Sequence, residues 1–264
     1  MADGNILKGM KPYDNDTVSV ITPVYNAERF IGSMIESVLG QSYKQVEIVL
    51  VDDCSKDNSA EIIAQYATRH GNIVYHRLEK NQGAAVARNT ALRLATGRYV
   101  AFLDSDDIWC EGKLDRQMAF MREHDAAITC TAMDTIDENG KPLGSVREVR
   151  HTIDHALLLR NTMIATSTVL IDRSKTGDFT MPAYRGGQDY ATWLMLMRNG
   201  TLCHGLNEVL THYRVLSKSL SSNKWKSVRQ VWQIQRREEG LSPISAAINV
   251  TFFIANAFVK HFIK

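Results

Sequence analysis

The sequence predicts an α/β fold built on a doubly wound, mostly parallel sheet, and three observations predict it. Short β-branched runs alternate with amphipathic segments over residues 17–110, the order of a parallel sheet with crossover helices. The runs at 18–22, 46–51 and 98–103 are short and apolar, as buried strands are. Polar or acidic residues follow each run. Ligands bind beyond the carboxyl ends of such strands, so these residues should meet in one crevice.

Each element is predicted from its local pattern. We expect strands where β-branched or apolar residues run without interruption, at 18–22, 46–51, 73–78, 98–103, 126–133 and 166–171. We expect helices where apolar residues recur at helical spacing or an N-cap residue opens the segment, at 27–39, 59–69, 84–95, 113–124, 150–160 and 190–198. Gly40, Gly97 and Gly200 follow three of these helices, where glycine favours a stop.

The bulk composition is that of a globular protein. The chain has 264 residues, of which 44% are hydrophobic and 23% charged, and its net charge of +2 does not favour a nucleic-acid partner. Its four cysteines form no Cys-x-x-Cys pair, which is typical of reduced thiols in a cytosolic protein. The first sixteen residues are polar and have no apolar signal region, so we expect a cytoplasmic catalytic domain.

Three carboxylates follow the apolar run at 100–103: Asp104, Asp106 and Asp107. Like charges repel, and a carboxylate at the edge of an apolar interior resists ionisation. A hard divalent cation such as Mg²⁺ or Mn²⁺ relieves both problems, and it takes its remaining ligands from phosphates and water. The cluster therefore predicts a metal that holds a diphosphate. The alternative is a cap for the next helix, for which one acid would be enough.

Four motifs occur in order along the first half of the chain. They are Pro-x-Tyr-Asn at 23–26, Val-Asp-Asp-x-Ser at 51–55, Asn-x-Gly-x-x-x-Ala-Arg-Asn at 81–89 and Leu-Asp-Ser-Asp-Asp at 103–107. Each is weak alone, but the ordered set is specific. Over about residues 17–222 the chain resembles the family-2 glycosyltransferases with a GT-A fold. The segments at 188–193 and 213–219 are similar to those of bacterial members that build O-antigen, capsule or teichuronic-type polysaccharides.

The resemblance implies a donor site for a UDP-sugar. Asp106 is then the main ligand of a Mn²⁺ or Mg²⁺ cofactor, Asp104 assists it, and Asp107 only shapes the loop. The implied nucleotide-sugar-binding residues are Pro23, Tyr25, Asp53, Gly83, Arg88, Asp104 and Ser105. Asp53 would accept a hydrogen bond from the base, and Tyr25 would stack on it. For Tyr25 and Arg88 the alternatives are core packing and a surface ion pair.

The resemblance also implies an acceptor site and an inverting reaction. Asp189 is the expected catalytic base that deprotonates the acceptor hydroxyl, although it could simply cap the following helix. The family usually has Glu before this Asp, and here the residue is the neutral Gln188. Gln188 and Trp193 are the expected acceptor contacts, with core packing as the alternative for Trp193. The expected acceptor is a glycan, carried by a polyprenyl diphosphate, that receives a hexose or N-acetylhexosamine.

Arg214 and Ser219 resemble a segment that closes over the diphosphate. Many relatives have His near the third position after the preceding Tyr, whereas this chain has Leu216. That departure weakens this part of the assignment. His212 is the nearest histidine, but its offset is wrong, and we assign it no role.

The tail differs in composition from the rest of the chain. Residues 218–240 contain six basic and two acidic residues, and residues 241–259 contain no charge. In the second segment a polar and an apolar stripe alternate at helical spacing, which favours a helix lying in a membrane surface. We therefore expect a catalytic domain at 1–222, with a nucleotide-sugar half at about 17–110 and an acceptor half at 111–222. The tail at 223–264 would hold it on the inner face of the cell membrane. The alternative is packing on the domain or on a partner in a homodimer.

Two other functions fit parts of the sequence. Asp-x-Asp after a strand also marks metal-dependent phosphatases, but Ile108 stands where those enzymes have Thr or Val, and Asp53 would have no role. A non-catalytic module that binds nucleotide sugar or membrane is the second alternative. The intact acids argue against it.

Overall fold

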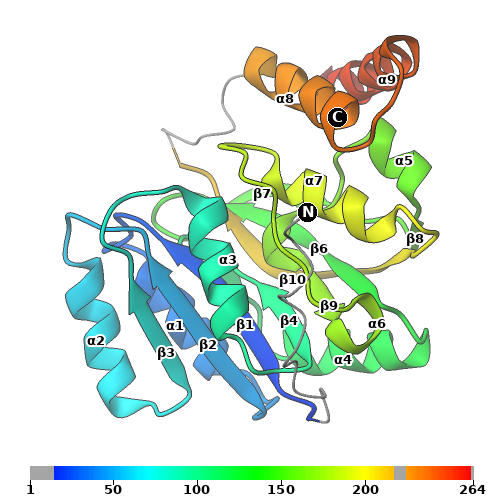
Figure 1. Cartoon of the computed structure of the whole chain (residues 1–264). Helices are drawn as coiled ribbons and strands as arrows, with labels where there is room; N and C mark the ends of the chain where they lie inside the picture. The colour runs from blue at the N-terminus through cyan, green and yellow to red at the C-terminus, as the bar shows by residue number, and fades with distance from the viewer. Residues whose placement is uncertain (1–14, 217–223, 263–264) are drawn as a thin grey trace, which may run out of the picture.

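The computed structural model describes residues 15–216 and 224–262 (Figure 1). Its strands are β1 (Val18–Val24), β2 (Val46–Asp52), β3 (Ile73–Arg77), β4 (Tyr99–Phe102), β5 (Ile108–Trp109), β6 (Ile128–Ile136), β7 (Pro142–Arg147), β8 (Thr152–Ile153), β9 (Leu170–Asp172) and β10 (Cys203–Arg214). Its helices are α1 (Ile31–Leu39), α2 (Ser59–Arg69), α3 (Ala84–Leu94), α4 (Lys113–Glu123), α5 (His155–Arg160), α6 (Arg173–Thr176), α7 (Gln188–Met197), α8 (Lys224–Arg237) and α9 (Pro243–Phe262). A 3₁₀ turn, η1 (Thr166–Thr168), lies between α5 and β9.

The strands form one sheet in the order β3-β2-β1-β4-β9-β6-β10-β5, with β7 paired to β6 and β8 paired to β10. The first four are parallel, and the register places Val24 beside Asp52 and Ile21 beside Phe102. The carboxyl ends of β1, β2 and β4 therefore point the same way, as predicted. Helix α1 begins at Ile31 rather than near 27, because the preceding residues form a turn in which Ala27 N–H bonds Ser59 Oγ.

The second half of the sheet is mixed. β9 is antiparallel to β4 and β6, and β10 is parallel to β6 but antiparallel to β5. Strand β10 has no counterpart among the predicted elements. Its register against β6 shifts between Leu206 and Val209 and again before Thr211, which breaks the alternation that marks a strand. The segment 166–171, predicted as one strand, is η1 followed by the start of β9.

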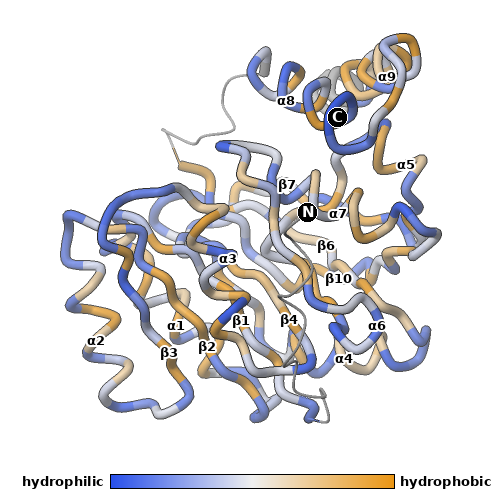
Figure 2. The backbone as a smooth tube through the Cα atoms, viewed as in Figure 1, coloured by the Kyte–Doolittle hydropathy of each residue, from blue (hydrophilic) through white to orange (hydrophobic). Residues whose placement is uncertain are grey.

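Two apolar layers enclose the sheet (Figures 1 and 2). Side chains of α1, α2 and α4 fill one face, and side chains of α3, α5 and α7 fill the other. Helices α8 and α9 lie against each other at one end of the molecule, where α9 contacts α5. Val231, Ile234 and Val250 join them to the core of α5 and α7. The predicted boundary at 222 falls outside the described residues.

A buried lysine packs against β5. Lys113, at the start of α4, is 0% exposed, and its ammonium lies 2.5 Å from Gln117 Oε1 and 4.2 Å from the centroid of the Trp109 ring. Burial lowers the pKa of Lys113 from its ordinary 10.5 to about 7. Between these two values the unfolded chain holds one more proton than the folded chain, so the protein loses stability as the pH falls.

Lys113→Met should therefore stabilise the protein, by an amount that depends on pH. The difference in unfolding free energy between variant and wild type should widen by up to about 1.4 kcal/mol per pH unit as the pH falls from about 9 to about 7. Below that range it should level off, because both states of the wild type are then protonated. Urea unfolding at several pH values measures this, with the exposed Lys80→Met as a control. A difference for Lys113→Met that does not change with pH would contradict the prediction.

Candidate active site

The acid loop, residues 104–107, connects β4 to β5 and is anchored by its last member. Asp107 is 1% exposed, and its Oδ2 accepts a hydrogen bond from Ser167 Oγ at 2.5 Å. Its Oδ1 accepts a hydrogen bond from the backbone N–H of Arg214 at 2.9 Å. Burial first, then the charges of Asp106 and Asp104, raise the pKa of Asp107 well above its usual range. Asp107 therefore ties the loop to η1 and β10 and has no oxygen directed at solvent.

Asp104 and Asp106 are the carboxylates of this loop that a cation could reach. Asp104 is ion-paired with Arg88, and its side chain is 32% exposed. Burial, and next the charge of Asp104, raise the pKa of Asp106 to about 6. A divalent cation would offset both effects, since it favours the ionised carboxylate. Because Arg88 already occupies one oxygen of Asp104, Asp106 has more capacity for the metal.

The donor set fits Mg²⁺ or Mn²⁺ better than a metal enclosed by protein. Within residues 15–216 and 224–262, no group of three or more His, Cys, Asp or Glu side chains could hold a metal ion. Mg²⁺ binds proteins through one or two carboxylates and completes its shell with phosphate oxygens and water. Two hard oxygen donors at the end of a strand are therefore compatible with a cation that arrives with a diphosphate.

The ends of β1 and β2 bring the predicted base-binding residues together. The N–H of Asp53 bonds Val24 O at 2.8 Å, which places Asp53 beside Tyr25. Asp53 is 3% exposed, and its two oxygens accept the N–H groups of Gln82 and Gly83, both at 2.7 Å. Asp53 therefore fixes the turn before α3, in which Gly83 has φ +90. Each carboxylate oxygen can accept a second hydrogen bond, so a base contact stays open to Asp53.

Three other residues predicted to bind the donor lie at or next to the ends of β1 and β4. Tyr25 is 46% exposed at the end of β1, so its ring is available for stacking rather than for core packing. Pro23 precedes it within β1, and Ser105 lies half-buried between the two acids of the loop.

Arg88 is buried between the acid loop and α7. It is 6% exposed, so it is not a surface ion pair, and its contact with the nucleotide stays a prediction. Besides Asp104, it bonds the Gln188 side chain when the Gln188 amide takes the orientation that pairs both of its atoms: Nη1 then donates at 2.6 Å to the amide oxygen, and the amide nitrogen donates to Tyr184 O at 2.5 Å. Arg88 thus connects the acid loop to the first residue of α7, one position before Asp189.

Asp189 lies in the first turn of α7, and its Oδ2 accepts a hydrogen bond from Thr166 Oγ1 at 3.0 Å. Thr166 precedes Ser167, so one short turn contacts both Asp189 and Asp107. Ser167 Oγ also accepts the N–H of Asp104 at 3.1 Å. The sequence interpretation assigned no role to these two hydroxyls. The run Thr-Ser-Thr at 166–168 within an otherwise apolar segment is the signal that could have indicated them.

The predicted acceptor contacts are buried. Trp193 is 1% exposed and packs edge-on against Phe102, with ring centroids 5.4 Å apart, so it fills the core instead of facing a sugar. Gln188 is 7% exposed and is occupied by Arg88 and Tyr184. Both side chains point inward, because the first turns of α7 pack directly on the sheet.

The predicted diphosphate contact Arg214 is also directed inward. It is 5% exposed, and its guanidinium donates to backbone oxygens of Asp106 at 2.8 Å and Asp137 at 3.0 Å while lying over the Phe30 ring. Arg214 therefore holds the acid loop next to the turn that begins at Asp137. Ser219, its predicted companion, lies outside the described residues.

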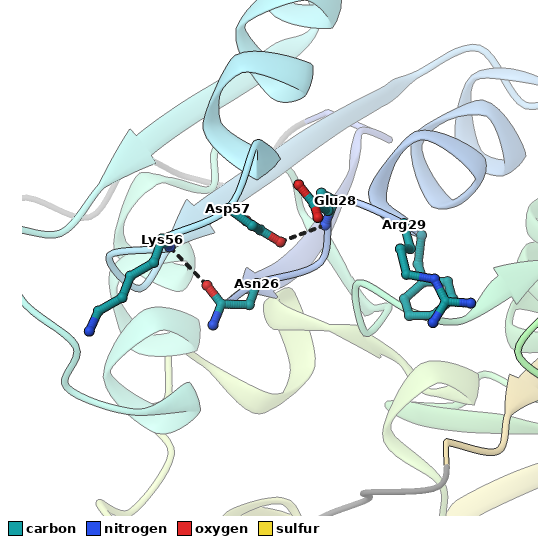
Figure 3. Close-up of a pocket in the computed structure, with 6 residues that line it drawn as sticks. Asn26, Glu28, Arg29, Lys56 and Asp57 are labelled. Carbon is teal, nitrogen blue, oxygen red and sulfur yellow. Dashed lines mark hydrogen bonds between the residues drawn. The ribbon is translucent and has the colours of Figure 1, made fainter.

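An open pocket of about 370 Å³ lies beside this crevice, between the loops that follow β1 and β2. Figure 3 shows the bonds that shape it: Asp57 accepts the N–H of Glu28, and the side chain of Asn26 accepts the N–H of Lys56. Arg29 points away from these bonds. None of the residues predicted to bind the donor or the metal lines this pocket, so it is a neighbour of the site rather than the site itself.

Comparison with known proteins identifies relatives over nearly the whole chain. The model of the family described as Glycosyl transferase family 2 matches residues 19–185. TuaG of Bacillus subtilis (strain 168), named as a teichuronic acid biosynthesis glycosyltransferase, is 43% identical over 243 residues, 92% of this chain and 96% of that protein. WfaP of Escherichia coli, named as a UDP-Glc:alpha-D-GlcNAc-diphosphoundecaprenol beta-1,3-glucosyltransferase, is 32% identical over 246 residues, 93% of this chain and 96% of that protein.

Solved structures share the fold. S. aureus TarS in complex with UDP-GlcNAc superposes with a TM-score of 0.70 at 22% identity, over 90% of this chain and 71% of that chain. The mannosyltransferase PcManGT from Pyrobaculum calidifontis, in complex with GDP-Man and Mn²⁺, gives 0.63 at 17% identity, over 92% of this chain and 72% of that chain. The predicted GT-A fold is confirmed by the likeness to TarS and by the parallel order of β3, β2, β1 and β4.

Removal of the Ser167 hydroxyl should destabilise the protein. Ser167→Ala deprives the buried Asp107 carboxylate of a donor, which should lower the free energy of unfolding by about 1–3 kcal/mol. Urea unfolding measures this. The matched control is Ser33→Ala, whose exposed hydroxyl bonds Phe30 O at 2.8 Å and should contribute less than about 0.5 kcal/mol. Equal effects of the two substitutions would show that Asp107 does not depend on Ser167.

Proposed function

Because this chain belongs to glycosyl transferase family 2, we propose that it is an inverting, metal-dependent enzyme of bacterial surface-polysaccharide synthesis. It transfers a hexose or N-acetylhexosamine from a UDP-sugar to a glycan carried by a polyprenyl diphosphate. The observation that carries this proposal is the placement of Asp106 and Asp189. They lie on loop 104–107 and helix α7, and both of these contact η1.

The relatives support the choice of donor and acceptor. WfaP is named for a UDP-glucose donor and a diphosphoundecaprenol-linked acceptor, and the chain covers 96% of its length. In this chain the half-exposed Tyr25 offers a stacking face beside Asp53, whose oxygens keep acceptor capacity for an N–H of the base. The two features suit a uracil ring held at the ends of β1 and β2.

Asp106, with Asp104 beside it, would hold Mn²⁺ or Mg²⁺. When bound, the cation supplies positive charge that stabilises the leaving diphosphate. Arg88 orients Asp104 through their ion pair, and Arg214 fixes the backbone of Asp106 through its carbonyl oxygen. These two arginines would therefore shape the donor site through the residues that they bond.

Asp189 would act as the general base. Its carboxylate takes the proton of the acceptor hydroxyl, whose oxygen attacks the anomeric carbon from the face opposite the diphosphate. The bond from that carbon to the diphosphate oxygen breaks, and UDP leaves with the electron pair. Thr166 donates to one oxygen of Asp189, which fixes the orientation of the carboxylate. Attack and departure on opposite faces invert the configuration.

The tail would bind the surface of the cell membrane, on its inner face. Among the described residues, no helix is long and apolar enough to cross a bilayer. Helix α9 instead directs a stripe outward, with Ile244 75%, Ile248 50% and Phe252 48% exposed. The adjoining side packs on the domain: Arg160 lies 5.1 Å from the centroid of the Phe252 ring and 3.4 Å from Asn249, and Ala246 and Val250 are buried. Trp225 on α8 is 82% exposed among basic residues, a combination suited to anionic lipid.

Removal of the proposed base should slow sugar transfer without weakening nucleotide binding. Asp189→Asn should reduce sugar transfer by at least about 10²-fold and leave the affinity for UDP with Mn²⁺ within about threefold. Asp106→Asn should weaken the affinity for UDP with Mn²⁺ by at least about tenfold. Isothermal titration measures binding, and product formation on a lipid-linked acceptor measures transfer. The control Asp125→Asn, on an exposed turn with φ 46, should change neither. Undiminished transfer by Asp189→Asn would exclude it as the base.

The exposed stripe should control membrane binding. Replacement of Ile244, Ile248 and Phe252 by Ser should reduce the fraction bound to anionic phosphatidylglycerol vesicles by at least about fivefold, because the buried apolar area is lost. Vesicle flotation measures this. The control replaces Leu94, Leu143 and Leu202, which are exposed elsewhere, by Ser. Unchanged flotation together with a shift from dimer to monomer would assign the stripe to a second copy of the chain.

A further inference from the structure

Three side chains outside the proposed site form a line across neighbouring strands. The Sγ of Cys110 lies 3.3 Å from His212 Nε2, and His212 Nδ1 lies 2.6 Å from Asp134 Oδ1. The pairing of β10 with its two neighbouring strands, β5 and β6, brings the three side chains together. β10 pairs with β5 so that His212 faces Ile108, two residues before Cys110, and it pairs with β6 so that His212 faces Asp134. A thiol, an imidazole and an orienting carboxylate in this order are the parts of an activated nucleophile.

The imidazole that faces the sulfur of Cys110 is positively charged at neutral pH. The hydrogen bond with Cys110, followed by that with Asp134, raises the pKa of His212 to about 9, so the imidazole is protonated at neutral pH. An imidazolium N–H directed at sulfur stabilises the thiolate. The backbone N–H of Lys113, at the start of α4, bonds Cys110 O at 3.3 Å. The nearby ion pair of Arg116 and Glu208 also connects α4 to β10. Because its two charges cancel, it adds no net charge near the sulfur.

Small reagents can reach this sulfur. Cys110 is partly exposed, and the side chains of His212 and Asp134 are 35% and 24% exposed. The other thiols differ. Cys130 and Cys203 are buried with their sulfurs 3.6 Å apart, whereas Cys54 is partly exposed and its sulfur faces the carbonyl oxygen of Glu79. Cys54 is also partly exposed, and no imidazole within residues 15–216 and 224–262 bonds it, so it is an internal control.

We propose that Cys110 is a modification site that reacts with low-molecular-weight disulfides. The Cys110 thiolate attacks one sulfur of the disulfide, a new S–S bond forms, and the other half leaves as a thiolate that takes up a proton. His212 and Asp134 are positioning residues in this reaction, because they hold the thiolate and do not touch the departing group.

Modification of Cys110 would also weaken binding at the donor site. This second effect rests on the proposed function. Cys110 N–H bonds Leu210 O at 3.0 Å, which holds β5 against β10. Asp107 lies three residues before Cys110, and Arg214, whose N–H anchors Asp107, lies two residues after His212. A bulky group on Cys110 would separate the two strands and displace this anchor. Modification should therefore weaken nucleotide binding at the acid loop.

The test uses oxidised glutathione as the probe and mass spectrometry of peptides as the readout. At pH 7, Cys110 should form its adduct roughly tenfold faster than Cys54 in the same molecules. His212→Gln and Asp134→Asn should each lower the Cys110 rate toward that of Cys54, and Cys54→Ser should leave the Cys110 rate unchanged. Circular dichroism confirms that each variant is folded.

Two results would overturn the proposal: equal rates at Cys110 and Cys54 in the wild type, or an unchanged Cys110 rate in folded Asp134→Asn. The effect on the donor site is measured separately, as a fall of at least about fivefold in the affinity of glutathionylated protein for UDP with Mn²⁺. The Cys110→Ser variant, treated in the same way, should keep its affinity. Rapid modification without this fall would remove the connection to the donor site and leave the reactive thiolate in place.

Discussion

The buried carboxylate of Asp107 is the interaction on which the rest of the site depends. It accepts a hydrogen bond from Ser167 Oγ and one from Arg214 N–H, so it fastens the loop after β4 to η1 and to the end of β10. A carboxyl group this deep in the protein costs free energy to bury, and the two hydrogen bonds offset part of that cost. The constraint fixes where Asp104 and Asp106 project. The acid cluster thus divides into one anchor and two carboxylates that can face a cation.

The same turn joins the two halves of the site. Thr166 and Ser167 are adjacent, and they bond the expected base and the loop anchor respectively. A second connection runs from Asp104 through Arg88 to Gln188 at the start of α7. Gln188 stands where the family usually has Glu. A carboxylate there would compete with Asp104 for Arg88, whereas the neutral amide leaves the charge of Arg88 to Asp104. In the proposed reaction the donor and acceptor groups must stay at a fixed separation, and these two connections would provide it.

The sequence predicted the strands at 18–24, 46–52, 73–77 and 99–102 well, because they are continuous apolar runs that end in polar residues. Strand β10 was missed because its register shifts twice, and η1 was taken for a strand because its threonines favour extended structure. Burial explains the remaining differences. Trp193, Gln188 and Arg214 have side chains suited to ligands, but the folded chain directs all three inward. The pairing of Cys110 with His212 depends on strand order, which no local pattern contains.

Measurement of Mn²⁺ affinity in the presence of UDP tests the division of the acid loop most directly, with Asp106→Asn compared against Asp107→Asn. Asn at 107 can still accept the N–H of Arg214, and the hydroxyl of Ser167 can rotate to accept from the new amide. The account predicts that Asp107→Asn keeps its Mn²⁺ affinity within about threefold while its unfolding free energy falls, and that Asp106→Asn loses at least about tenfold in affinity. A folded Asp107→Asn protein that loses as much Mn²⁺ affinity as Asp106→Asn would contradict it.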